Sequence, residues 1–156
     1  MAVTAEHAAL LDRFDEELRL ASAPTLDLLI RLKTTACTRL PALDKSAPAA
    51  RLEQFIAGAA WTEAAIGLIN LEIPGWKLRR VVCEDGDWHC SLSRQPNLPI
   101  ELDDLAEASH EVLALAVLRA FVAARRRDAL VRQAVSTVPQ IRPTSAVLVC
   151  GCDNFA

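Results

Sequence analysis

The segment WKLRRVVCEDGDWHCSLS, residues 76–93, contains two strand-like runs on either side of Asp85 and Gly86. An Asp-Gly pair accepts the positive φ angles of a type I′ turn, whose twist matches that of two paired strands. The segment therefore predicts a β-hairpin in which Glu84 lies opposite Asp87. Because alternate residues of a strand share a face, the apolar face of the hairpin is expected to consist of Val81, Cys83, Trp88, Cys90 and Leu92.

Helical patterns flank this hairpin on both sides. Apolar residues recur there at the spacing of one helix face, between prolines that begin or end the pattern. The helices predicted in this way cover residues 5–21, 24–40, 48–73 and a long stretch that begins near 101–104. Asp104 and Glu107 have the spacing of a capping-box variant, which favours a helix start at this point.

Together these elements predict one α+β domain over residues 1–156, mainly helical, with about four helices around one core and the hairpin at one side. Apolar residues make up 52% of the chain and charged residues 24%, a balance typical of a globular domain. Prolines interrupt the chain from about residue 136 onward. Within that tail, SAVLVCGC, residues 145–152, is a candidate third, C-terminal strand beside the hairpin.

The charge and the apolar segments argue against several classes of protein. A formal net charge of -3, from 17 basic and 20 acidic residues, makes nucleic-acid binding unfavourable. We expect no secretory signal in the N-terminal residues, which include acidic residues and lack a basic leader. The apolar segment 55–73 contains Glu63, and the segment 112–124 is too short for a bilayer, so we expect no membrane span and a cytoplasmic location.

The cysteines are the first candidate site. Five occur, an odd number that favours reduced thiols over a disulfide framework. If the C-terminal segment pairs with the hairpin, four thiolates would converge on a tetrahedral zinc ion. These thiolates would come from Cys83, Cys90, Cys150 and Cys152. The spacing lacks the usual Cys-x-x-Cys pairs, so buried thiols without metal, and no cofactor, are the favoured interpretation.

A pocket between the helices and the hairpin is the second candidate. Glu63 lies in the most apolar predicted helix, where a buried carboxylate would need a basic partner or a ligand. Trp61 and Trp88 are the aromatic residues expected to line such a pocket beside it. The alternative for Glu63 is a place on an exposed stripe of the helix.

Residues 61–99, WTEAAIGLINLEIPGWKLRRVVCEDGDWHCSLSRQPNLP, resemble a recurrent segment of small uncharacterised proteins of alphaproteobacteria of the rhizobial type. The resemblance implies an intact bacterial domain. It implies no activity and assigns no functional residue.

No catalytic motif of high specificity occurs in the chain. We therefore expect a non-enzymatic interaction or regulatory domain that self-associates through apolar helical surfaces, as a dimer or with another protein partner. Small residues in the third predicted helix would allow close approach of another helix, within the core or between copies: Ala57, Gly58, Ala59, Ala60, Ala64, Ala65 and Gly67. The alternative function is small-molecule or metal binding at the two candidate sites above.

Overall fold

A computed structural model describes residues 2–137 of the chain. This part contains five α-helices, two short 3₁₀ helices and three strands. The helices are α1 (Ala2–Leu20), α2 (Leu26–Ala36), α3 (Ala47–Ala57), α4 (Trp61–Glu72) and α5 (Leu113–Thr137), and the 3₁₀ helices are Leu40–Leu43 and Ile100–Leu102. The strands are β1 (Lys77–Glu84), β2 (Asp87–Ser93) and β3 (Leu105–His110). The predicted α+β class, mainly helical with a hairpin, is confirmed.

The hairpin forms with the predicted register. Glu84 pairs with Asp87, Cys83 with Trp88 and Val81 with Cys90. Asp85 has a φ of 53° and Gly86 a φ of 91°, as a type I′ turn requires.

The apolar face of the hairpin is only partly buried, which corrects the prediction. Cys90 and Leu92 of β2 are in the core, whereas Val81 and Cys83 of β1 are exposed. The sheet order is β1-β2-β3, and α5 packs against β2 and β3. β1 is the edge strand on the side away from β3 and packs less against α5 than β2 and β3 do, so Val81 and Cys83 stay exposed.

The third strand of the sheet is β3, which pairs antiparallel with β2. The prediction that a helix begins near 101–104 was wrong, because residues 105–110 are extended and α5 starts only at Leu113. Asp104 and Glu107 therefore form no capping box. The segment is extended because it pairs with β2 along residues 105–110, where Ala106 lies opposite Leu92 and is fully buried. The predicted strand at 145–152 lies outside the described residues.

The third predicted helix is in fact two helices, α3 and α4. α3 ends at Ala57 with Gly58 as its C-cap, and Ala59 adopts a φ of 54°, in the left-handed region that ends helices. The chain then reverses so that α4 packs against α3. The second predicted helix is shorter than expected, since Thr25 caps it through a hydrogen bond from Leu28 N and it ends at Ala36.

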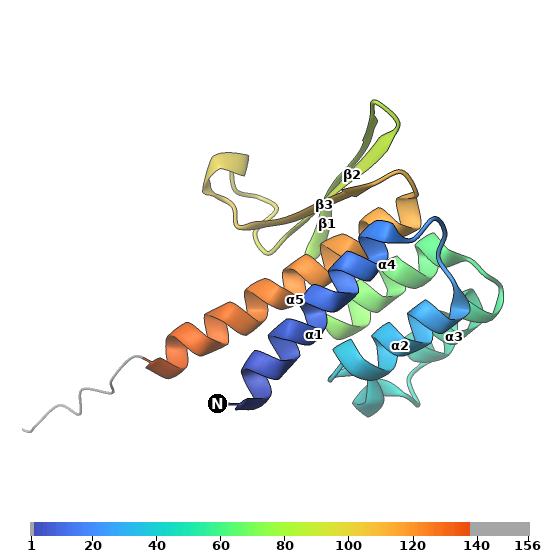
Figure 1. Cartoon of the computed structure of the whole chain (residues 1–156), viewed down its shortest axis with the longest axis horizontal. Helices are drawn as coiled ribbons and strands as arrows, with labels where there is room; N and C mark the ends of the chain where they lie inside the picture. Colours follow the sequence, from blue (N-terminus) through green and yellow to red (C-terminus); the bar gives the residue numbers. More distant parts are fainter. Residues whose placement is uncertain (1, 138–156) are drawn as a thin grey trace, which may run out of the picture.

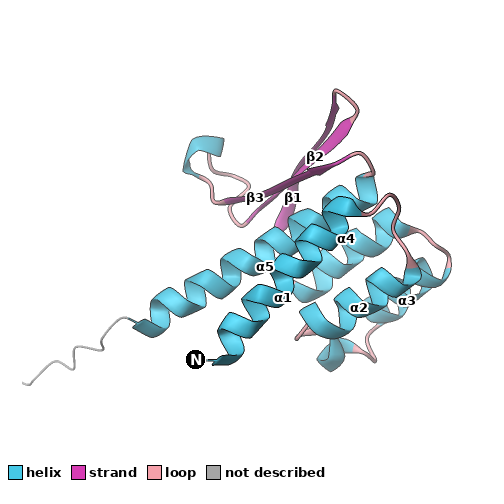
Figure 2. Cartoon of the chain, viewed as in Figure 1, coloured by secondary structure: helices cyan, strands magenta, loops and turns pink. Residues whose placement is uncertain are grey.

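The core forms around α5, as Figures 1 and 2 show. The strands lie on one side of α5, and α1 and α4 pack along its other side. Residues on all sides of α5 are buried in its first half, including Leu115, Val117, Leu118, Phe121 and Val122. Among described residues 2–137, no helix is long and apolar enough to cross a bilayer.

Candidate functional site: a groove between α3 and α4

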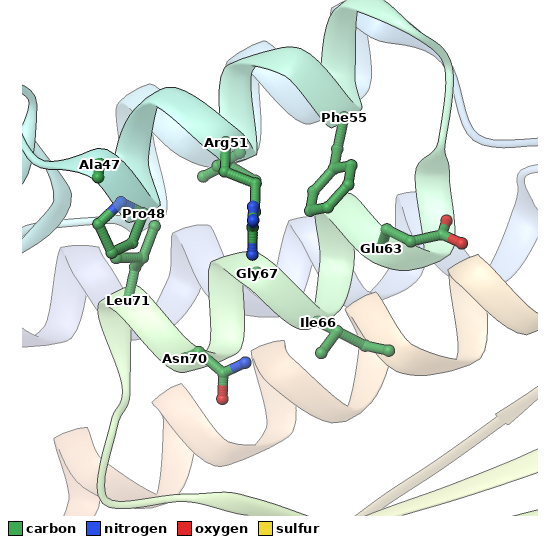
Figure 3. A pocket seen from close by; sticks show the side chains of 10 residues that line it. Ala47, Pro48, Arg51, Phe55, Glu63, Ile66, Gly67, Asn70 and Leu71 are labelled. Carbon is green, nitrogen blue, oxygen red and sulfur yellow. The ribbon is translucent and has the colours of Figure 1, made fainter.

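A groove of about 730 Å³ runs between α3 and α4 on the surface of the molecule. We call it the α3–α4 groove. Its lining residues are Ala47, Pro48, Arg51, Leu52, Phe55, Glu63, Ile66, Gly67, Asn70 and Leu71. Figure 3 shows Arg51 and Phe55 extending from α3 toward α4.

Each helix contributes one face to the groove. Besides Ala47 and Leu71, the lining positions of α3 are 48, 51, 52 and 55, and those of α4 are 63, 66, 67 and 70. Both sets follow the spacing i, i+3, i+4, i+7, which places side chains on one stripe of a helix. The groove therefore follows two neighbouring helix stripes over about two turns, or roughly 12 Å at the rise of an α-helix.

Local features fix the two walls. Ser46 caps α3 by accepting a hydrogen bond from Ala49 N at 3.3 Å, and Pro48 fits its first turn. Gly67 lies against Leu52, and a Cβ at this glycine would be 3.4 Å from Leu52 Cδ1. The missing side chain keeps the middle of the groove hollow above the buried Leu52.

Three polar side chains border the apolar floor: Arg51, Glu63 and Asn70. All three are exposed, and none has a hydrogen-bond or ion-pair partner among residues 2–137. A cation, an anion and an amide thus remain available to a bound molecule.

Glu72 at the end of α4 has a structural role. Its carboxylate accepts hydrogen bonds from three consecutive backbone amides, at 2.8 Å from Thr38 N and 2.9 Å from both Arg39 N and Leu40 N. Arg125 of α5 forms an ion pair with it at 3.3 Å. Glu72 and Arg125 are buried, and their contacts tie the residues after α2 to α4 and α5, which holds the groove on the core.

The candidate zinc ligands do not form a site in the described residues. Cys83 is exposed and Cys90 buried, and Cys150 and Cys152 lie outside the described part of the chain. No group of three His, Cys, Asp or Glu side chains in residues 2–137 is placed to hold a metal ion. Burial raises the pKa of Cys90 to about 12, which keeps its thiol protonated at neutral pH.

The candidate pocket residues are separated. Glu63 lines the α3–α4 groove and is exposed, while Trp61 and Trp88 are half-buried and pack against the core without lining this groove. Sequence reasoning missed Arg51, Phe55 and Asn70. The helical spacing of these residues can be read from the sequence. However, the predicted continuous helix from 48 to 73 would place α3 and α4 end to end, with no groove between them.

A smaller polar hollow of about 310 Å³ lies on the sheet. Both basic and acidic side chains line it, and its Arg80 forms an ion pair with Glu84. Since its charges partly neutralise one another, it selects a ligand less clearly than the α3–α4 groove does.

Comparisons with protein-family models, curated proteins and solved structures found no match to this chain.

Proposed function

We propose that the chain is a protein–protein interaction domain that binds an amphipathic helix in the α3–α4 groove. The observation that carries this proposal is the pair of adjacent stripes on α3 and α4, with an apolar floor and with border polar groups that have no hydrogen-bond or ion-pair partner among residues 2–137. In helix-in-groove recognition, a bound helix inserts side chains at i, i+3, i+4 and i+7 into a hydrophobic groove. The surface between two adjacent helices can bind such side chains.

Shape favours a helix as the occupant. The groove follows α3 and α4 along their length, so a third helix laid into it would complete a three-helix layer. Apolar anchors of this helix would contact Phe55, Ile66 and the hollow above Gly67. Burying them stabilises the complex by roughly 25 cal/mol for each Å² of apolar surface removed from water, before the cost of association.

Charge sets the direction of the bound helix. Arg51 extends over the middle of the groove, and Glu63 lies at the end near Phe55 (Figure 3). A helix with a basic side chain toward Glu63 and negative charge toward Arg51 is complementary to both. The reversed helix would place like charges together.

A stapled model helix tests this proposal. The probe is a fluorescein-labelled peptide of about 14 residues, close to four helical turns, with leucines at i, i+4 and i+7 and one lysine and one glutamate at its borders. Fluorescence anisotropy should show saturable binding to the full chain. Asn70→Trp fills the groove and should weaken binding at least about tenfold, a change of roughly 1.4 kcal/mol.

The matched control is Gln54→Trp, which adds the same side chain to an exposed position of α3 that does not line the groove. Its affinity for the probe should equal that of the unaltered chain. Absence of binding to the unaltered chain, or equal losses in both variants, would reject the proposed function.

A further inference from the structure

We infer that a second copy of this chain pairs with the outer edge of the sheet, β1 against β1 in antiparallel orientation. The two three-stranded sheets would then form one continuous sheet across a two-fold axis. This inference goes beyond the proposed function, because it uses a different surface and requires no helix in the α3–α4 groove.

The outer edge of β1 has no strand partner in the described part of the chain. Within residues 2–137 the sheet order is β1-β2-β3, and no backbone hydrogen bond joins β1 to a segment other than β2. A strand edge of this kind is a template for pairing with another chain. The turn of the hairpin also projects beyond the helices, where a second molecule can approach it (Figure 1).

The half of β1 next to the turn is the part suited to pairing. A β-bulge between Leu78 and Arg80 interrupts the ladder, and bulges commonly end the pairing of an edge strand. The regular part of the strand is therefore residues 80–84. Its apolar side chains Val81 and Cys83 are both exposed, Val81 at 37%. A partner strand would cover part of both.

The turn determines which backbone groups of β1 point outward. Glu84 and Asp87 are positions i and i+3 of the turn, which makes them a hydrogen-bonded pair. Since hydrogen-bonded and non-hydrogen-bonded pairs alternate in an antiparallel ladder, Val82 also directs its backbone groups toward β2. The N–H and C=O groups of Val81 and Cys83 therefore point away from β2, toward the partner.

Hydrogen bonding allows three registers for residues 80–84, because outward-pointing residues must lie opposite one another. Val81 lies opposite Val81, Val81 opposite Cys83, or Cys83 opposite Cys83. In the second register Arg80 of each copy lies opposite Glu84 of the other copy, and Val82 lies on the two-fold axis. In the other two registers Arg80 and Glu84 have no charged residue opposite. Charge complementarity therefore selects the second register.

The charges that select the register are exposed and close together in each copy. Arg80 and Glu84 form an ion pair at 3.2 Å, with side chains 60% and 56% exposed. Opposite charges directly across an antiparallel ladder stabilise it, and like charges destabilise it. The dimer would join the two ion pairs into one network of four charges across the axis.

A charge swap between two variants tests the inference. Glu84→Arg places an arginine opposite Arg80 of the other copy, and Arg80→Glu places a glutamate opposite Glu84. By light scattering after size exclusion, each variant alone should dissociate at a concentration at least about tenfold higher than the unaltered dimer does. An equimolar mixture should form heterodimers, seen by native mass spectrometry, because both cross-strand pairs then have opposite charges.

Mixing separates a contact between copies from the ion pair within one copy. Both variants lose their internal pair of Arg80 with Glu84, and mixing two folded chains cannot restore it. The matched control is Asp44→Arg, which reverses an exposed charge outside the sheet. It should leave the dimer unchanged.

Disulfide formation tests the register. Val82→Cys places a thiol on the two-fold axis in a non-hydrogen-bonded pair, whose Cα atoms are about 4.5 Å apart and within the range of a disulfide. In a Cys83→Ser background, mild oxidation should link this variant into a covalent dimer. Lys77→Cys in the same background lies beyond the bulge and should not link. Peptide mass spectrometry identifies the residues that are joined.

Three outcomes would overturn the inference. The first is a chain of residues 1–156 that stays monomeric at all concentrations. The second is a mixture of the two charge variants with no more dimer than either variant alone, because the contact would then lie elsewhere. The third is a disulfide from Val82→Cys to Cys150 or Cys152 of the same chain, which would assign the edge of β1 to the C-terminal segment. Binding of the stapled probe is a separate readout, so each proposal can fail without the other.

Discussion

At the scale of single residues, the buried carboxylate of Glu72 is held both by hydrogen bonds and by an ion pair. Three amides, the Thr38 hydroxyl and Arg125 surround its carboxylate. Buried ion pairs are often no more stable than an apolar replacement, but removing one partner leaves the other charge uncompensated. Arg125 Nε already lacks a hydrogen-bond partner, so little is left to satisfy this guanidinium.

Glu72→Gln should therefore destabilise the fold by about 3 to 5 kcal/mol, the usual result of breaking a buried pair. Urea unfolding followed by circular dichroism measures the change. Glu72→Leu/Arg125→Met removes both charges and should be more stable than Glu72→Gln. A loss below about 1 kcal/mol in the single variant would show that the pair is solvated.

The thiols differ in reactivity for a reason visible at the same scale. Burial, together with the nearby Glu72 carboxylate, raises the pKa of Cys37 to about 12, and burial alone does so for Cys90. The thiolate is the reactive form, so both should resist alkylation at neutral pH.

Cys83 is exposed and should be alkylated by iodoacetamide well before Cys37 and Cys90. Peptide mass spectrometry after brief labelling reports each site separately. Equal labelling of Cys90 and Cys83 in the folded chain would contradict the burial of β2. Labelling in urea is the control, because unfolding should make all of these thiols react.

At the scale of elements, sequence reasoning succeeded where one local signal fixes the structure. The register of the hairpin from Arg80 to Ser91 follows from Asp85 and Gly86, since their φ angles select the turn and the turn selects these pairs; beyond them the register shifts between Leu78 and Arg80. Residues 105–110 have no comparable signal, and the capping-box spacing there was coincidental. These residues form a strand because they pair with β2, and this tertiary contact cannot be predicted from the sequence of the segment itself.

The break between α3 and α4 shows the same limit for the candidate site. An apolar run through residues 48–73 hides the reversal, although Gly58 and Ala59 mark it. Glu63 was identified because a charge within an apolar helix is conspicuous. Its neighbours across the groove belong to α3, and only the relative placement of the two helices brings them together.

Ala59→Gly should stabilise the chain by up to about 1 kcal/mol, because glycine avoids the steric cost of the left-handed conformation at this position. Thermal unfolding measures the shift in Tm. Ala50→Gly, at an exposed position inside α3, should instead cost about 1 kcal/mol. Destabilisation by Ala59→Gly would mean that a different backbone conformation links α3 to α4.

At the scale of the whole molecule, Asp103 ties the connection between β2 and β3 to the hairpin. It accepts a hydrogen bond from Ser93 Oγ and forms an ion pair with Arg79. Burial by itself raises the pKa of Asp103, but these two partners outweigh burial and hold the pKa below its ordinary range.

A lowered carboxyl pKa links the stability of the fold to pH. The folded state binds this proton less readily than the unfolded state, whose aspartate pKa is about 3.9. The stabilisation is therefore present above about pH 4 and is lost as the pH falls through the folded pKa. Asp103→Asn should lower stability at pH 7 and flatten its decline in acid, as measured by urea unfolding at several pH values.

Asp44→Asn is the control for this experiment, since it changes an exposed carboxylate that has no ion pair within the described chain. It should leave the acid profile as it is. A profile of Asp103→Asn that falls as steeply as that of the unaltered chain would show that other carboxylates govern acid unfolding.

The antiparallel contact of α1 with α5 has a consequence for synthesis on the ribosome. Arg119 Nε donates to Asp15 Oδ1 at 3.0 Å across 104 residues of sequence. At about 5 to 20 residues per second, translation separates these two positions by roughly 5 to 20 s. During that interval Leu11, Phe14 and Leu18 have no α5 to cover them. The apolar face of α1 therefore stays in contact with water on the nascent chain until α5 has been synthesised.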